Sequence, residues 1–144
     1  MSTPPPCPER CSVLLIGGGG REHALAWKLS QSPRLGRLWC THPQNPGIAE
    51  LAEACPVPLD VKRPFHIQRW CDTEGIDLVI VGPEAPLAEG VADALATDRR
   101  LVFGPTRDGA RIEADKAWAK QLMRSASVPT ADGRTFSELG PARE

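Results

Sequence analysis

The sequence predicts one α/β domain in which helices cover both faces of a mainly parallel sheet. Short runs of β-forming residues alternate along the chain with segments of helical periodicity, as in successive β-α-β units. Two of these runs, 13–16 and 76–81, are almost wholly apolar, which is typical of central strands buried on both faces, and each is followed by glycine. In 144 residues one such core can form, but a second complete domain does not fit.

The first half of the chain opens with a proline-rich stretch, residues 1–11, which is expected to be a flexible leader. After it the pattern predicts a strand over 13–16 and a helix from the glycines to Ser32, with Ala24, Leu25, Trp27 and Leu29 near one face of that helix. The elements predicted next are a strand over 38–40, a weak helix over 48–54, a marginal strand near Val57 and a helix between Pro64 and Asp72. The first helix is expected to end at Ser32 because a residue before proline disfavours helical angles.

The second half predicts the strand over 76–81, a helix that begins around Pro86, a strand over 101–103 and one long helix over about 108–127. The long helix is inferred from apolar residues that recur every four positions: Ala110, Ala114, Trp118 and Leu122. Residues 130–144 contain strand-like fragments such as 134–136 but no convincing terminal element. We therefore expect 108–144 to be less firmly packed than the sheet.

Composition excludes several classes of function. With 17 Lys and Arg against 18 Asp and Glu, and no basic run, the chain is not expected to bind nucleic acid. No apolar stretch approaches the length of a membrane span, and no apolar signal region follows Met1, so we expect a cytoplasmic protein without membrane contact. The five cysteines include no C-x-x-C pair, which indicates reduced thiols and no metal site.

A run of four glycines, 17–20, lies between the first strand and its helix, followed by Arg21 and Glu22. Backbone N–H groups at a helix N-terminus attract anions, so this loop predicts a phosphate site; a tight turn is the alternative. The dinucleotide fingerprint fails because Glu22 stands where the third glycine is needed, and the Walker A pattern is absent. Glu22 is equally explained as a helix cap, and His23 as a residue that packs within the helix.

Two further polar loops follow predicted strands. Gly82, Pro83 and Glu84 come directly after the fourth strand, and 45–47, Asn-Pro-Gly, follow the second. Ligands bind at the carboxyl edge of open parallel sheets, so these loops predict a sugar-binding region beside the phosphate site. Glu84 could equally be a helix N-terminal carboxylate, and Asn45 part of a plain turn. Taken alone, the loops predict phosphosugar binding and no chemistry.

Five segments in a fixed order carry a more specific signal. They are G-G-G-G-R-E-H-A-L-A-W-K-L (17–29), N-P-G-I-A (45–49), V-G-P-E-A-P-L-A-E-G (81–90), F-G-P (103–105) and I-E-A-D-K-A-W-A-K-Q-L-M (112–123). Through them the chain resembles the glycinamide ribonucleotide synthetase family, the phosphoribosylamine–glycine ligases of purine biosynthesis, from Ser12 to about Phe136. It departs from the family at Gln44, where glycine is usual, and at Asp115, where serine is usual.

The resemblance implies a Rossmann-like pre-ATP-grasp domain over 12–105, which binds phosphoribosylamine, and a linking helix with the start of a truncated ATP-grasp region over 106–144. In the family, ATP with Mg²⁺ or Mn²⁺ activates glycine as glycyl phosphate, which the amine of 5-phosphoribosylamine attacks to give glycinamide ribonucleotide, ADP and phosphate. The substrate-binding residues implied are Gly18, Gly19, Gly20, Arg21, Asn45, Gly47, Gly82, Pro83 and Glu84. Lys116 resembles a lysine that related enzymes direct at ATP phosphates; a solvated helix lysine is the alternative.

Two functions remain open at this point. The chain is either the N-terminal part of the ligase, inactive alone because the catalytic residues and metal ligands lie in the missing region, or a non-catalytic phosphosugar- or nucleotide-binding module of the same fold. An ATP-grasp segment downstream in the coding region would favour the first. In both cases we expect a monomer.

Overall fold

A computed structural model describes residues 8–138, 140 and 143 and confirms the predicted α/β class. Its five strands form one parallel sheet in the order β3-β2-β1-β4-β5. The strands are β1 (Cys11–Ile16), β2 (Leu35–Cys40), β3 (Glu53–Ala54), β4 (Leu78–Val81) and β5 (Leu101–Phe103). The chain therefore places β1 at the centre, between β2 and β4.

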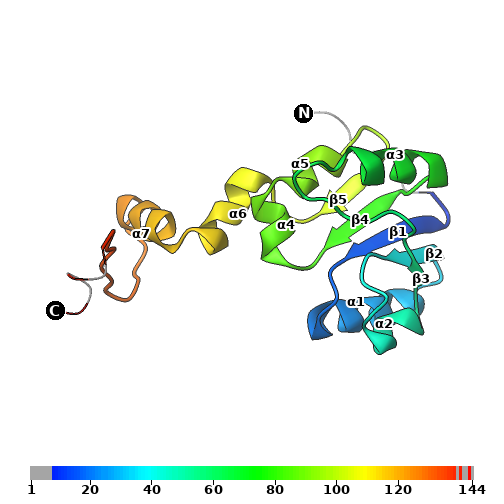
Figure 1. The fold of residues 1–144 in the computed structure, drawn as a ribbon, viewed down its shortest axis with the longest axis horizontal. Coiled ribbons are helices and arrows are strands. Elements are labelled where there is room, and N and C mark those ends of the chain that lie inside the picture. Colours follow the sequence, from blue (N-terminus) through cyan, green and yellow to red (C-terminus); the bar gives the residue numbers. More distant parts are fainter. Residues whose placement is uncertain (1–7, 139, 141–142, 144) are drawn as a thin grey trace.

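Seven helices connect and extend these strands in the described part of the chain. They are α1 (Gly20–Ser30), α2 (Pro46–Ala49), α3 (Phe65–Glu74), α4 (Glu84–Ala88), α5 (Val91–Leu95), α6 (Arg107–Ala114) and α7 (Lys116–Ser125). Figure 1 shows α3 and α5 on one side of the sheet, α1 and α2 on the other, and α6 and α7 extending away from it. No helix among the described residues is both long and apolar enough to cross a membrane.

The central strands supply two apolar clusters because successive side chains point to opposite faces. Leu14 and Ile16 of β1 pack with Val79 and Val81 of β4 beneath α3 and α5. On the other face, Val13, Leu15 and Ile80 pack with Ala26 of α1. Trp39 and Trp70 meet edge to face in the first cluster, with ring centroids 5.2 Å apart, and join β2 to α3.

Several predicted boundaries in the first half are wrong by a few residues. β1 begins at Cys11, inside the predicted leader, whose residues 1–7 lie outside the described residues. The weak helix predicted over 48–54 is α2 at 46–49, because Asn45 accepts the Gly47 and Ile48 N–H groups and starts the helix earlier. This leaves 53–54 free to form β3, ahead of the strand predicted near Val57.

The face predicted for α1 is also partly wrong. Trp27 and Ala24 are exposed, Leu25 and Leu29 are half-buried, and the residues that α1 buries fully are Glu22 and Ala26. The spacing of apolar residues predicted the wrong buried face because one of the two side chains that α1 buries fully is a carboxylate, Glu22.

Two predicted helices are each divided in two. The helix predicted from Pro86 separates into α4 and α5 at Gly90, whose φ of +88° lies outside the helical region. The long helix predicted over 108–127 separates into α6 and α7 at Asp115, whose side chain accepts the Trp118 N–H at 3.0 Å and so caps a new helix. Residues 134–136 form no strand.

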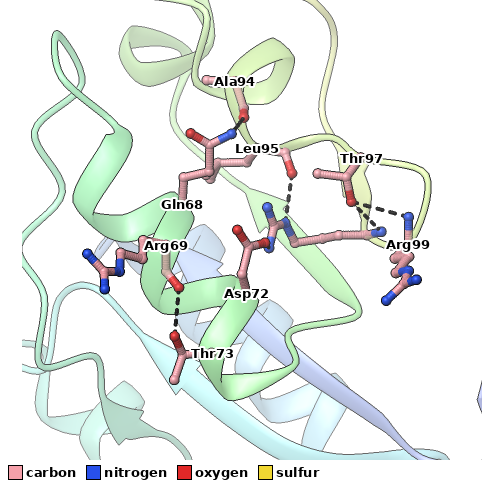
Figure 2. Close-up of polar contacts among 9 residues, drawn as sticks. Gln68, Arg69, Asp72, Thr73, Ala94, Leu95, Thr97 and Arg99 are labelled. Carbon is pink, nitrogen blue, oxygen red and sulfur yellow. Dashed lines mark hydrogen bonds and ion pairs between the residues drawn. The ribbon is translucent and has the colours of Figure 1, made fainter.

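A buried arginine ties the amino-terminal end of β5 to the helices above it. Arg100 is 3% exposed; its Nε donates to the Leu95 carbonyl at 2.7 Å and its Nη1 to Asp72 at 2.9 Å. Figure 2 shows Asp72 on α3 facing Leu95 and Thr97 on the segment that leads into β5. The Thr97 hydroxyl accepts the Arg100 N–H and fixes the turn.

Arg100→Met should destabilise the fold by about 1–3 kcal/mol, because the buried Leu95 carbonyl loses its donor while the apolar part of the side chain is kept. Urea denaturation gives the free energy of unfolding. The matched control is Arg99→Met, at an exposed side chain one residue earlier, for which a change within about 0.5 kcal/mol is expected. Equal effects of the two variants would contradict the structural role of Arg100.

Asp115 stands where the family usually has serine, and the two residues should be interchangeable because serine can cap α7 in the same way. Asp115→Ser should leave amide hydrogen exchange at Trp118 and Ala119 within about twofold of the parent. Asp115→Ala should speed that exchange about fivefold, since loss of an N-cap costs about 1 kcal/mol. Unchanged exchange in Asp115→Ala would mean that the carboxylate does not define the start of α7.

Candidate functional site

Three loops meet at the carboxyl edge of the sheet, where β2, β1 and β4 end side by side. The glycine-rich loop 17–20 follows β1, residues 41–47 follow β2, and 82–84 follow β4. The structure thus brings together the nine residues from which a phosphosugar site was predicted. Parallel strand order accounts for this, since loops 24 to 65 residues apart in sequence become neighbours.

Hydrogen bonds join the three loops directly. The Gly17 N–H donates to the Thr41 hydroxyl at 3.2 Å, and Asn45 Nδ2 donates to the Gly18 carbonyl at 2.9 Å. Arg21 reaches across from α1 and donates to the Gly82 carbonyl. Asn45 also caps α2 with its oxygen, so both ends of its amide hold the loops in place. Asn45 was predicted to line the sugar-binding region, and in the structure it also holds the loops together.

Close packing leaves no room for a side chain at two of the site glycines, Gly18 and Gly82. A Cβ at Gly82 would lie 2.0 Å from Glu22 Oε1, and a Cβ at Gly18 would lie 2.6 Å from the Cβ of His42. Gly20, by contrast, has no atom within 4 Å of such a Cβ and faces open space. The loop is therefore tightly packed at its start and open where α1 begins.

Glu22 is the site residue that the sequence identified only as a helix cap. It is 4% exposed, and its Oε2 accepts the Gly19 N–H at 2.6 Å, which confirms the cap. Its Oε1 is buried at 3.8 Å from Arg21 Nε, and no described residue donates a hydrogen bond to it. A buried acceptor without a donor is costly. No sequence pattern shows this burial, because it arises from contact with Gly17 and Gly82.

Two histidines flank the loops. The ring of His23 lies beside Gly47 of α2, where an added Cβ would come within 2.5 Å of it, while the residue as a whole is exposed. His42 was not predicted as a site residue. Its Nδ1 lies 2.8 Å from the Thr41 hydroxyl that holds Gly17. Its position directly after β2 is the signal that could have identified it.

Glu84 and Lys116 lie on the α4 and α7 side of the site. Pro83 precedes α4 and Glu84 is its exposed first residue, beside a groove of about 720 Å³ that Arg21 and Gly82 also line. Lys116, the exposed first residue of α7, instead lines a neighbouring groove of about 730 Å³ with Glu84 and Glu113. The structure therefore separates Lys116 from the glycine-rich loop but places it next to Glu84.

The pKa values of two buried thiols are raised. Burial raises the pKa of Cys40 at the end of β2, beside the site, and it raises the pKa of Cys71 in α3, at the opposite end of the sheet, to about 12. Both thiols are therefore neutral near pH 7 and unsuited to nucleophilic attack. Among the residues that the structure describes, no three His, Cys, Asp or Glu side chains gather in a way that could hold a metal ion.

Gln44, which departs from the family pattern, lies in a turn without backbone strain. Gln44 is exposed in the turn between His42 and Asn45, and its φ is not positive. A turn of this geometry does not require glycine, so the neighbouring Asn45 cap forms without strain.

Comparison with known proteins agrees with this architecture. Residues 11–113 match the family described as phosphoribosylglycinamide synthetase, N domain. The chain is 50% identical to the phosphoribosylamine–glycine ligase of Nostoc sp. (strain PCC 7120) over 131 residues, which cover 91% of this chain and 31% of that protein. It is 48% identical to the ligase of Synechocystis sp. (strain PCC 6803), over 91% of this chain and 31% of that protein. It is also 44% identical to the trifunctional purine biosynthetic protein adenosine-3 of Drosophila melanogaster, over 91% of this chain and 10% of that protein.

The chain thus spans about a third of the length of the ligases it matches. The family match covers the whole sheet, the three loops and α6 except for its last residue. Since it includes more than half of the 144 residues, the chain belongs to the phosphoribosylglycinamide synthetase family and contains its N domain.

Proposed function

We propose that this chain is the part of a phosphoribosylamine–glycine ligase that binds 5-phosphoribosylamine. The observation that carries the proposal is the junction of three loops at one sheet edge, with a helix N-terminus, a cationic side chain and a buried acceptor oxygen together. A sugar phosphate that carries an amine needs hydrogen-bond donors for its phosphate, which the helix N-terminus and the cationic side chain supply. It also needs acceptors for its hydroxyls and a negative group near its amine.

The phosphate is proposed to lie against Gly18, Gly19 and Gly20 with Arg21 beside it. The first N–H groups of α1 have no acceptor within the helix, and the helix dipole favours an anion there. Arg21 already bonds the Gly82 carbonyl and is otherwise exposed, so its remaining N–H groups can reach a phosphate oxygen. The open space at Gly20 leaves room for that approach.

The ribose and its amine are proposed to lie toward Gly82 and Glu84, with Asn45 and Gly47 on the opposite side. Glu22 Oε1 is buried against Gly82 and has no hydrogen-bond donor within the described residues. It therefore contributes negative charge beneath the amine rather than a direct contact with the ligand. Glu84 adds a second, exposed carboxylate at the mouth of the groove.

The ligation itself we assign to the complete enzyme. The matched relatives are named as ligases that join phosphoribosylamine and glycine, and they are about three times the length spanned here. ATP would supply the energy for that bond, with Mg²⁺ or Mn²⁺ bound to its phosphates. The described residues do not fit a metal site, so no step through the metal is assigned to them. Lys116 is proposed to face the nucleotide from the groove it shares with Glu84.

A reducing, cytoplasmic setting agrees with Cys40, Cys55 and Cys71, which are thiols outside any disulfide.

Arg21→Met should weaken binding of ribose 5-phosphate to the 144-residue chain about tenfold or more, since a charge-assisted hydrogen bond contributes about 1.5–3 kcal/mol. Isothermal titration calorimetry measures the Kd. The matched control is Arg63→Met, which removes an exposed arginine that pairs with Asp60 away from the site and should leave the Kd within about twofold. Both variants should melt near the parent temperature. Equal affinity of the parent and Arg21→Met would contradict the proposed phosphate position.

A further inference from the structure

His42 lies at the substrate edge, and the binding arrangement proposed above gives it no task. It follows β2 by two residues, is exposed, and its side chain lies against the glycine-rich loop. A Cβ added at Gly18 would stand 2.6 Å from the Cβ of His42 and 3.2 Å from its ring atom Cδ2. The first of the glycines assigned to the phosphate therefore has an imidazole ring as its neighbour.

Thr41 determines which nitrogen of this ring carries the proton. Its hydroxyl oxygen accepts the Gly17 N–H at 3.2 Å and lies 2.8 Å from His42 Nδ1. The hydroxyl has one proton to donate, and among the described residues Nδ1 is the acceptor within its reach. Nδ1 is therefore the acceptor of this bond, and the proton of the neutral ring lies on Nε2.

The Nε2–H group of His42 is left available for a ligand. Nε2 is bonded to Cδ2, so it lies along the ring edge that borders Gly18 and on the side of the ring away from Thr41. No residue in the described part of the chain accepts a hydrogen bond from it, and His42 is exposed. A hydrogen-bond donor whose orientation is set by Thr41 is thus present beside the glycine-rich loop.

This donor complements Arg21, which approaches the loop from the other side. Arg21 is held at the Gly82 carbonyl, on the β4 side of the loop, whereas His42 comes from the β2 side. A phosphate monoester has three terminal oxygens that accept hydrogen bonds, so it can bond to backbone N–H groups, a guanidinium and an imidazole from different directions. A sugar without the phosphate lacks these acceptors, so a donor at this position favours the phosphorylated sugar.

We propose that His42 is a binding residue that selects the phosphorylated sugar, with its Nε2 donating a hydrogen bond to a phosphate oxygen. Thr41 is then a positioning residue, because it acts on the ligand through the ring that it orients. The inference rests on the proposed function, since it takes the glycine-rich loop to hold the phosphate.

Two substitutions at His42 separate donation of a hydrogen bond from packing against Gly18. His42→Leu keeps an apolar side chain but has no donor, so the Kd for ribose 5-phosphate in isothermal titration calorimetry should rise about tenfold or more. His42→Gln carries an amide N–H at about the reach of Nε2 and should stay within about threefold of the parent. The matched control, His66→Leu, changes an exposed histidine of α3 outside the three loops and should leave the Kd within about twofold.

Ring ¹⁵N spectra of the parent chain test the proposal without any substitution, so they also cover a variant that fails to fold. At alkaline pH the neutral ring of His42 should carry its proton on Nε2. The Nε2 signal should move on addition of ribose 5-phosphate but not of ribose, while that of His66 stays in place. A proton on Nδ1, or a His42 signal that ribose 5-phosphate leaves unchanged, would overturn the proposal.

Failure of this inference is distinguishable from failure of the proposed function. Equal loss of affinity in His42→Leu and His42→Gln would make His42 a packing residue, and unchanged affinity in both would remove it from the site. In either case, binding by the parent that weakens in Arg21→Met would still support the substrate assignment. Absence of ribose 5-phosphate binding by the parent would overturn both.

Discussion

The buried carboxylate of Glu22 is the contact on which the geometry of the substrate edge depends. One oxygen caps α1 through the Gly19 N–H, and the rest of the side chain packs where a Cβ at Gly17 or Gly82 would stand. The end of β1, the start of α1 and the end of β4 are thus held around one side chain. Burying a charge is expensive, and the Arg21 guanidinium, whose Nε lies 3.8 Å from Glu22 Oε1, offsets part of that cost.

The surrounding groups follow from this contact. With the β1 and β4 loops held close together, Arg21 reaches the Gly82 carbonyl, and Asn45 and Thr41 bring in the loop after β2. The result is an edge built largely from backbone groups, which suits a phosphate, with carboxylates at the side where a sugar amine would lie. The groove beside this edge is lined by Arg21, Gly82 and Glu84 together with apolar side chains of β4 and β5.

Features set by local pattern could be predicted from the sequence, whereas those set by single residues or by tertiary contact could not. The apolar runs before Gly17 and Gly82 predicted β1 and β4 because fully buried strands have a plain signature. Periodicity missed the breaks at Gly90 and Asp115, since one left-handed residue or one cap ends a helix without altering the apolar spacing. The burial of Glu22 depends on strand order, which sets the end of β4 beside the end of β1 and which no local pattern contains.

The proposed site requires the three loops that follow β1, β2 and β4 to bind one phosphosugar together. This is tested by titrating ¹⁵N-labelled chain with ribose 5-phosphate and following the chemical shifts of the backbone amides. Saturating shifts are expected at Gly18 to Arg21, with smaller ones at Gly47 and Glu84, all with a single Kd. Shifts centred on Thr97 to Arg100, at the opposite end of the sheet, or limited to one of the three loops, would contradict it.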